Sequence, residues 1–198
     1  MRSTKTCVLL LALCGCGKVD PTPSPDAGGV KPLEVTAVDG GCPIVVEAWP
    51  LGAGTHVPVG TDLSWPSNPP SSGAHYPVWA AFQEFTSPVP RGYYVHDLEH
   101  GAVVFLYNCA LWGGDCTRLT DALRQASASL PDDPKCSGGV RVRTVISPDP
   151  LLTDPIAAAS WGFVYRAQCA DLESLKAFAA AHYAHAPEDE CANGVTTF

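Results

Sequence analysis

The sequence is poor in positive charge, in methionine and in long apolar segments. Its 198 residues include 12 lysines and arginines against 20 aspartates and glutamates, and its single methionine is Met1. The net charge of −8 argues against nucleic acid or an anionic lipid surface as a partner. Without a further methionine, the chain lacks the thioether ligands that select Cu(I). A charged fraction of 16% beside an apolar fraction of 46% excludes a wholly disordered chain.

Several catalytic signatures are missing as well. The sequence has no C-x-x-C pair, which disfavours a thiolate zinc ribbon and a thioredoxin-type redox centre. It also has no Gly-x-Ser-x-Gly nucleophile elbow and no glycine-rich phosphate loop. The usual signatures of serine hydrolases and of nucleotide-binding enzymes are therefore not found.

The first 15 residues have the pattern of a lipoprotein signal peptide. Arg2 and Lys5 precede the apolar run 7–13, which is too short to span a bilayer but suits a secretory signal. The following Leu13-Cys14-Gly15-Cys16 resembles the lipobox of bacterial lipoproteins, so Cys16 is predicted to be lipidated. A signal that is cleaved without lipidation is the alternative. Lipidation would anchor the chain to a membrane without crossing it, which predicts an extracytoplasmic position in the cell envelope.

The cysteine count agrees with export. Once the two leader cysteines and Cys16 are set aside, six remain, which are Cys42, Cys109, Cys116, Cys136, Cys169 and Cys191. An oxidising compartment favours disulfides, and the short loop between Cys109 and Cys116 contains a Gly-Gly turn that favours a local bridge. Six cysteines permit about 15 connectivities, so the other pairs stay open. We expect three structural disulfides, with a buried or reactive free thiol as the alternative.

Composition also divides the exported chain into a tether and one domain. Residues 16–32 are dense in proline, glycine, serine and aspartate and contain no aromatic residue. Such a segment cannot bury enough surface to order itself, so we expect a disordered tether behind the lipid anchor. Residues 33–198 have the usual size of a single globular domain.

Residue patterns within this domain predict both strands and helices. Runs of β-branched and aromatic residues predict strands at 43–49 and 102–107. An alternation of apolar and basic residues predicts a half-exposed strand at 140–146, and alternating aromatic residues predict another at 157–166.

Apolar residues spaced by three or four predict helices over 117–130 and 171–185. Residues 52–91 are rich in proline and glycine and are expected to form an ordered loop, held by packing of Trp65, Trp79, Phe82 and Phe85. The expected fold class is α+β, with a small, mainly antiparallel sheet, two packed helices and long ordered Pro/Gly-rich loops.

Histidine placement is the most informative chemical feature. The sequence His96-x-x-Glu99-His100 would place two imidazoles on one face if the backbone were helical, and a third imidazole would complete a site for zinc or copper. The residues on either side, 92–95 and 101–104, favour extended chain, so we expect a single turn between strands. Such a turn could still present both histidines toward His75 in the proline-rich loop.

The pattern of these residues resembles a known family. Residues 68–73 (Asn-Pro-Pro-Ser-Ser-Gly) with His75, then Trp79, and then residues 96–101 (His-Asp-Leu-Glu-His-Gly) before an apolar strand resemble the domain of unknown function family 3105. The comparable family elements read P-P-x-S-G-x-H and H-x-L-E-H-G, and the resemblance covers His56 to Glu188. It implies that the residues to examine are His75, His96, Glu99 and His100, with His56 similar to a histidine upstream of the Pro-Pro motif. The cysteines and the tether are not part of the pattern, and the family has no established activity.

The hypothesis from the sequence is one mononuclear site formed by His75, His96 and His100, with His56 as an optional further ligand. Imidazoles with an optional carboxylate suit Cu(II) or Zn(II). Glu99 is expected to orient an imidazole by accepting its ring N–H. Two alternatives stay open for the motif: a hydrogen-bonded structural cluster, and an inverted zinc-peptidase site in which Glu99 is the general base. His182 and His185, at the end of a predicted helix, are expected to be structural.

Two functional classes follow from the sequence. The first is a membrane-tethered extracytoplasmic domain that binds a metal ion. The second is a binding or structural module of the envelope, whose histidines form a recognition surface with aromatic residues, notably Trp65, Tyr76, Trp79, Tyr93 and Tyr94. Convergence of imidazole nitrogens to within about 3 to 4 Å of one another would favour the first class. The sequence identifies no protein partner and no reaction.

Overall fold

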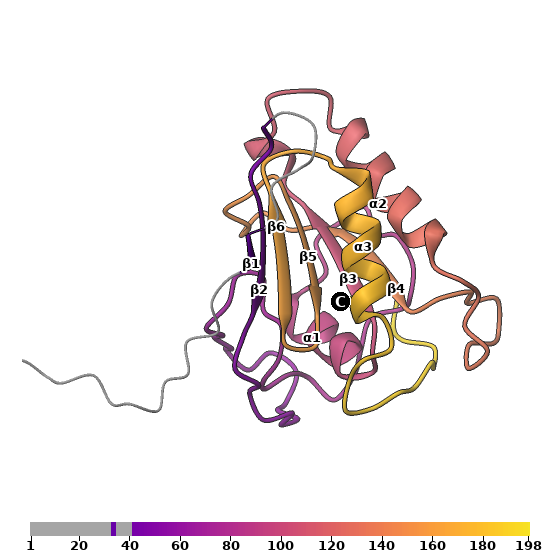
Figure 1. The fold of residues 1–198 in the computed structure, drawn as a ribbon. Helices are drawn as coiled ribbons and strands as arrows, with labels where there is room; N and C mark the ends of the chain where they lie inside the picture. Colours follow the sequence, from indigo (N-terminus) through magenta and orange to yellow (C-terminus); the bar gives the residue numbers. More distant parts are fainter. Residues whose placement is uncertain (1–32, 35–40) are drawn as a thin grey trace, which may run out of the picture.

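The computed structural model describes residues 33–34 and 41–198 (Figure 1). The predicted signal peptide at 1–15, the predicted lipidation site Cys16 and the predicted tether at 16–32 lie outside these ranges. Within the ranges, no helix has the length and apolar character that a bilayer span requires.

Six strands form one sheet in the order β1-β2-β6-β5-β3-β4. Neighbouring strands are antiparallel except β3 and β4, which are parallel. The strands are β1 (Leu33–Glu34), β2 (Ile44–Ala48), β3 (Val103–Tyr107), β4 (Thr144–Pro148), β5 (Ile156–Ser160) and β6 (Phe163–Ala167). A mainly antiparallel sheet with packed helices confirms the predicted α+β class.

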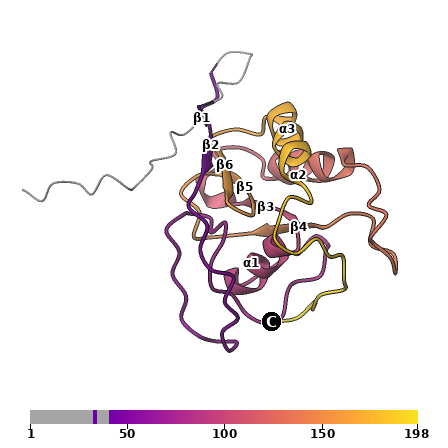
Figure 2. The same ribbon diagram turned by 60° about the horizontal axis from the view of Figure 1, so that its bottom comes forward.

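Helices cover both faces of this sheet (Figure 2). Helices α2 (Thr117–Ser129) and α3 (Leu172–His182) pack on one face, and α1 (Arg91–Glu99) packs on the other. The alternation of side chains along β3 separates the two layers, because Val103 and Phe105 face α2 and α3 whereas Val104 and Leu106 face α1. Helix α1 is therefore buried against the sheet on the side where the irregular residues 49–90 lie.

Two strand predictions were partly wrong. The predicted strand at 157–166 is a hairpin, in which β5 and β6 are joined by a turn at Trp161 and Gly162. The predicted strand at 140–146 begins only at Thr144, and Arg143 is buried rather than exposed. Arg143 can be buried because it forms ion pairs with Asp133 and Asp189.

The predicted helices at 117–130 and 171–185 are confirmed as α2 and α3, but α1 was missed. Seven of its nine residues are buried, so it shows no apolar stripe opposite a polar one. Its end has an identifiable cause, since Gly101 adopts a left-handed φ of +89°. The N–H groups of Gly101 and Ala102 donate to the carbonyls of Leu98 and Asp97, at 3.0 Å each, which is the Schellman termination of a helix.

Three disulfides are present among the described residues, as predicted. Cys109 and Cys116 form the expected local bridge. The others join Cys42 to Cys169 and Cys136 to Cys191. The last bridge fastens the C-terminal segment to the loop that precedes β4.

Candidate metal centre

Helix α1 positions the central residues of the site. His96 and Glu99 lie on the helix three residues apart, and His100 caps its C-terminus. The expectation of a single turn between strands was therefore wrong for residues 92–95, which are helical. The physical reason is tertiary: burial of α1 against the sheet outweighs the modest helix propensity of Gly92, Tyr94 and Val95.

The irregular residues 52–76 bring two more histidines to this helix. Backbone hydrogen bonds from Val57 N to His75 O (2.9 Å) and from His75 N to Thr55 O (3.0 Å) hold His56 beside His75. A further bond from Tyr76 N to Gly92 O, at 3.0 Å, fastens this part of the loop to α1. Residues separated by 40 positions in the sequence are thus held together by main-chain contacts.

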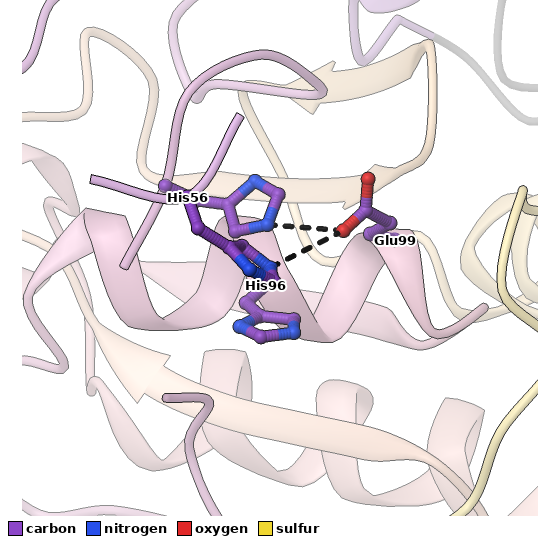
Figure 3. A group of neighbouring side chains, drawn as sticks. His56, His96 and Glu99 are labelled. Atoms are coloured by element: carbon purple, nitrogen blue, oxygen red, sulfur yellow. Dashed lines mark ion pairs between the residues drawn. The ribbon is translucent and has the colours of Figure 1, made fainter. Parts of the chain in front are cut away.

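Four side chains converge at this junction, and we call them the inner set: His56, His75, His96 and Glu99. Each offers a donor atom, and these atoms all lie within 4.8 Å of one another. Glu99 Oε2 lies 3.0 Å from His75 Nε2. It also lies 3.9 Å from His56 Nε2 (Figure 3). The His75 side chain is fully buried, whereas that of His56 is 48% exposed. The inner set is therefore a buried group of donors with one exposed member.

Backbone carbonyls fix the orientation of the two buried imidazoles. His75 Nδ1–H donates to Gly73 O at 2.8 Å, and His96 Nδ1–H donates to Tyr76 O at 2.7 Å. A ring that donates from Nδ1 in its neutral form carries a lone pair on Nε2. Metal-binding histidines are commonly oriented by such a bond from their second nitrogen.

The protonation of His96 agrees with a ligand role. Burial lowers the pKa of His96 to about 4, and the nearby His100, His75 and His56 add to this lowering, while the hydrogen bond to Tyr76 O opposes it. The His96 imidazole is therefore neutral near pH 7, and its Nε2 is available to bind a cation.

The contact between His75 and Glu99 is one that a positive charge would stabilise. Although these side chains approach to 3.0 Å, the buried His75 Nε2 has no hydrogen-bond partner among the described residues. A lone pair on His75 Nε2 would face the Glu99 carboxylate, which is repulsive unless a cation lies between them. Either a second proton on His75 or a metal ion would supply that cation.

A second group of donors lies next to the first, and we call it the outer set: His96, His100 and Glu188. His100 Nε2 lies 3.3 Å from Glu188 Oε2, and the His96 and His100 ring centroids are 4.6 Å apart. Trp79 packs edge-on against both rings. Burial lowers the pKa of His100, although nearby carboxylates, led by that of Glu188, oppose the shift.

The structure thus divides the histidines that the sequence assigned to one site. It brings His56, His75 and His96 together, but it places His100 in the outer set. Glu99, expected only to orient an imidazole, lies among the donor atoms themselves. Glu188 was missed because it lies in an acidic run that is typical of solvated surface. Its place at the end of the resemblance to family 3105 was the available signal.

Other sequence expectations concern residues outside the two sets. His182 packs on Phe163 and Phe178, and His185 Nδ1 bonds to Ala181 O at 3.0 Å, so both lie apart from the cluster. Of the five aromatic residues predicted for a recognition surface, Tyr94 cannot contribute, because it is fully buried between α1 and the sheet. Trp65, Tyr76, Trp79 and Tyr93 are half-buried.

Comparison with known proteins identifies the family but no activity. The model of the family described as "Protein of unknown function (DUF3105)" matches residues 56–194, a range that contains both sets. No curated protein and no solved structure matches the chain. Because the family model covers more than half of the sequence, this chain belongs to the DUF3105 family.

Proposed function

We propose that this protein is a lipid-anchored, extracytoplasmic metal-binding protein that holds one Cu(II) or Zn(II) ion in the inner set. The observation that carries the proposal is the common orientation of His75 and His96. Each ring is held by a carbonyl at Nδ1, so that both Nε2 atoms are left for the same cation as the Glu99 carboxylate.

The composition of the inner set supports the choice of metal. Three imidazoles suit Zn(II) and Cu(II), Zn(II) sites also accept a carboxylate, and no thiolate or thioether is among the four ligands. Ligand bonds near 2 Å would draw the four donor atoms closer around an ion. One carboxylate beside neutral imidazoles would partly balance the charge of a divalent ion in this buried position.

The number of ligands supports binding rather than hydrolysis. Catalytic zinc sites keep one position open for water, whereas four protein ligands close a tetrahedral site. The inner set offers four, and only His56 is substantially exposed. Dissociation of this exposed ligand would open the site, which suits sequestration or delivery of the ion.

The proposed location depends on the N-terminal residues. The lipobox-like sequence before Cys16 predicts anchoring, and three disulfides agree with an oxidising compartment. Labelling with a radioactive fatty acid in a bacterial host tests this part separately. Incorporation that is lost in Cys16→Ser supports the anchor, and equal incorporation by both proteins contradicts it.

Metal analysis tests the binding function. The chain is secreted without a histidine tag, equilibrated with Zn²⁺ or Cu²⁺ and desalted before elemental analysis. We expect about one equivalent of metal in the wild type and a clear loss in His96→Ala, which removes a ligand shared by both sets. His185→Ala is the matched control, because His185 lies outside both sets. Equally low metal content in all three folded proteins would exclude the proposal.

A further inference from the structure

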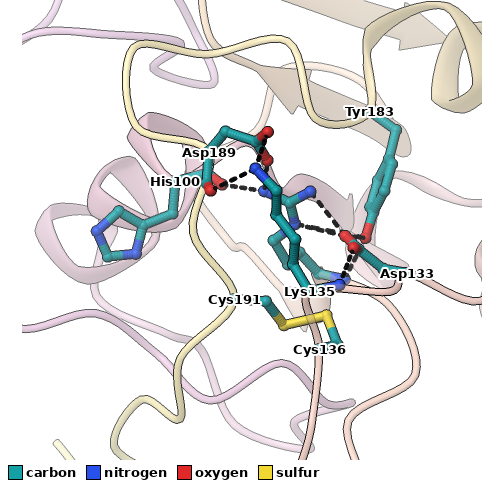
Figure 4. Close-up of polar contacts among 8 residues, drawn as sticks. His100, Asp133, Lys135, Cys136, Tyr183, Asp189 and Cys191 are labelled. Atoms are coloured by element: carbon teal, nitrogen blue, oxygen red, sulfur yellow. Dashed lines mark hydrogen bonds and ion pairs between the residues drawn. A yellow bond between two sulfur atoms is a disulfide. The ribbon is translucent and has the colours of Figure 1, made fainter.

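Hydrogen bonds hold the segment that carries Glu188 against the end of α1, so the residues of the outer set have fixed positions. Glu188 N donates to Glu99 O at 3.0 Å, which places the Glu188 side chain at the C-terminal end of α1. Arg143 Nη1 donates to His100 O at 2.7 Å and also to Asp189 Oδ1 at 2.7 Å. Figure 4 shows the contacts around His100 and Asp189 beside the Cys136–Cys191 disulfide. The backbone that carries Glu188 is therefore fixed to the helix that carries His96 and His100.

His100 itself is suited to bind an ion. Its side chain is only 3% exposed, its Nε2 faces Glu188 Oε2, and its Nδ1 has no hydrogen-bond partner among the described residues. A lone pair on Nε2 would face the Glu188 carboxylate at 3.3 Å, a repulsive arrangement that a cation between the two groups would relieve. His100 and Glu188 are therefore placed to share one ion through Nε2 and Oε2.

His96 belongs to both sets but can serve only one ion at a time. Its Nδ1 is engaged by Tyr76 O, so Nε2 is the single nitrogen available for coordination. An imidazole bridge between two metal ions would need both ring nitrogens. The two sets therefore compete for His96 Nε2.

We propose that the outer set is a second position for the ion held by the inner set, and that the ion passes between them by exchanging the other ligands of His96. This inference rests on the proposed function of the inner set. In the transfer, His96 Nε2 keeps its bond to the metal while His100 and Glu188 replace His56, His75 and Glu99. No electron is transferred, and the oxidation state of the metal is unchanged.

The two positions differ in a way that gives the transfer a direction. The inner set offers four protein ligands, and the outer set offers three, of which Glu188 is 52% exposed. Three protein ligands leave a coordination position for water or for a ligand from another molecule. The inner position therefore stores the ion more tightly, and the outer position presents it to a chelator or an acceptor.

Copper titration of the full secreted domain tests the proposal. Isothermal titration calorimetry with Cu²⁺ should give one equivalent in the wild type. A variant with a disabled inner set, His56→Ala/Glu99→Gln, should still bind one equivalent with lower affinity. Adding Glu188→Gln to this variant should weaken binding by a further factor of about 10 or more, whereas adding Glu173→Gln, an exposed residue of α3 and the matched control, should not.

Electron paramagnetic resonance identifies the position occupied. Nitrogen hyperfine splitting of bound Cu(II) should indicate three imidazoles in the wild type and two in the inner-set variant, the latter sensitive to His100→Asn. In the wild-type background, Glu188→Gln should leave affinity nearly unchanged but slow the release of copper to a chelator.

Each contrary result has a separate meaning. Two equivalents in the wild type, no binding by the inner-set variant when it is folded, or no effect of Glu188→Gln in that variant would overturn the second position alone. A wild type that binds no copper would overturn the proposed function and the second position together.

Discussion

Replacing Glu99 by glutamine separates a metal site from a structural ion pair. Glutamine keeps the size of the side chain but removes its charge, and its amide can donate to His75 Nε2. If the cation between these groups is a proton on His75, the substitution leaves a buried imidazolium without its partner. If the cation is a metal ion, the metal-free variant instead loses a repulsive contact between a lone pair and a carboxylate, which lie 3.0 Å apart.

The two cases differ in the size and sign of the effect on stability. Breaking a buried ion pair costs about 3–5 kcal/mol. In a chain of this length, about 1 kcal/mol shifts Tm by about 2–4 °C, so an ion pair predicts a fall of about 6–20 °C. The metal proposal predicts an unchanged or raised Tm for the metal-free variant.

Addition of metal completes the comparison. At a free concentration about 100 times Kd, an ion stabilises the folded state by about 2.7 kcal/mol, which corresponds to about 5–11 °C in Tm. Differential scanning calorimetry should show this increase for the wild type and a much smaller one for Glu99→Gln at the same Zn²⁺ concentration. Glu84→Gln is a control, because Glu84 pairs with Arg124 at the surface. A large fall of Tm in chelator, without a metal-dependent rise in the wild type, would refute the reasoning.

Three further predictions concern the surroundings of the site. Gly54→Ala should weaken metal binding about 10–100-fold in a competition titration, because a Cβ at this position would lie 1.8 Å from Glu99 Oε1 and displace the carboxylate. Removal of the Cys136–Cys191 bridge, which spans 55 residues, should lower the free energy of unfolding by about 4 kcal/mol in urea titrations. The charge on Asp133 should stabilise the fold above about pH 4 and cease to do so at lower pH. Burial raises the pKa of Asp133, but hydrogen bonds led by that from Tyr183 outweigh it and leave the pKa below its usual value.

Each of these predictions has a matched control. Gly113→Ala should leave metal affinity unchanged, since a Cβ there meets no atom within 4 Å. Loss of the Cys109–Cys116 bridge, with a separation of 7 residues, should cost only about 2.5 kcal/mol. Asp133→Asn should remove the part of the acid sensitivity that the carboxylate causes. Equal effects of the two glycine variants, equal effects of losing the two bridges, or unchanged acid sensitivity in Asp133→Asn would contradict the corresponding argument.

Patterns of local periodicity predicted most of the fold. Helices α2 and α3 each have one buried stripe of apolar residues, and β2 and β3 are short runs of strand-forming residues. The local residue pattern of each segment therefore indicates its secondary structure. Helix α1 is buried on nearly every side and contains Gly92 and Val95, so neither periodicity nor propensity marks it. Its termination signal, Gly101, was visible in the sequence but equally compatible with a turn.

The site was predictable in composition but not in arrangement. The spacing of His96, Glu99 and His100 identified a segment that contributes to both sets, but the partition into two sets depends on contacts between distant parts of the chain. His56 joins the inner set through backbone bonds to the residues around His75, and Glu188 joins the outer set through the C-terminal segment. Contacts between distant segments produce no periodic residue pattern, so they cannot be predicted from a single sequence.

The position of Glu99 also bears on the zinc-hydrolase interpretation of the motif. That interpretation gains from the observation that His96 and His100 lie at a helix end, four residues apart, with Glu188 as a third donor. It also requires Glu99 to act as general base on a metal-bound water. A carboxylate that binds the ion in the inner set cannot serve as that base at the same time. The two interpretations therefore predict opposite results for Glu99→Gln: a hydrolase would keep its zinc and lose turnover, whereas the metal-holding site proposed here would lose affinity for the ion itself.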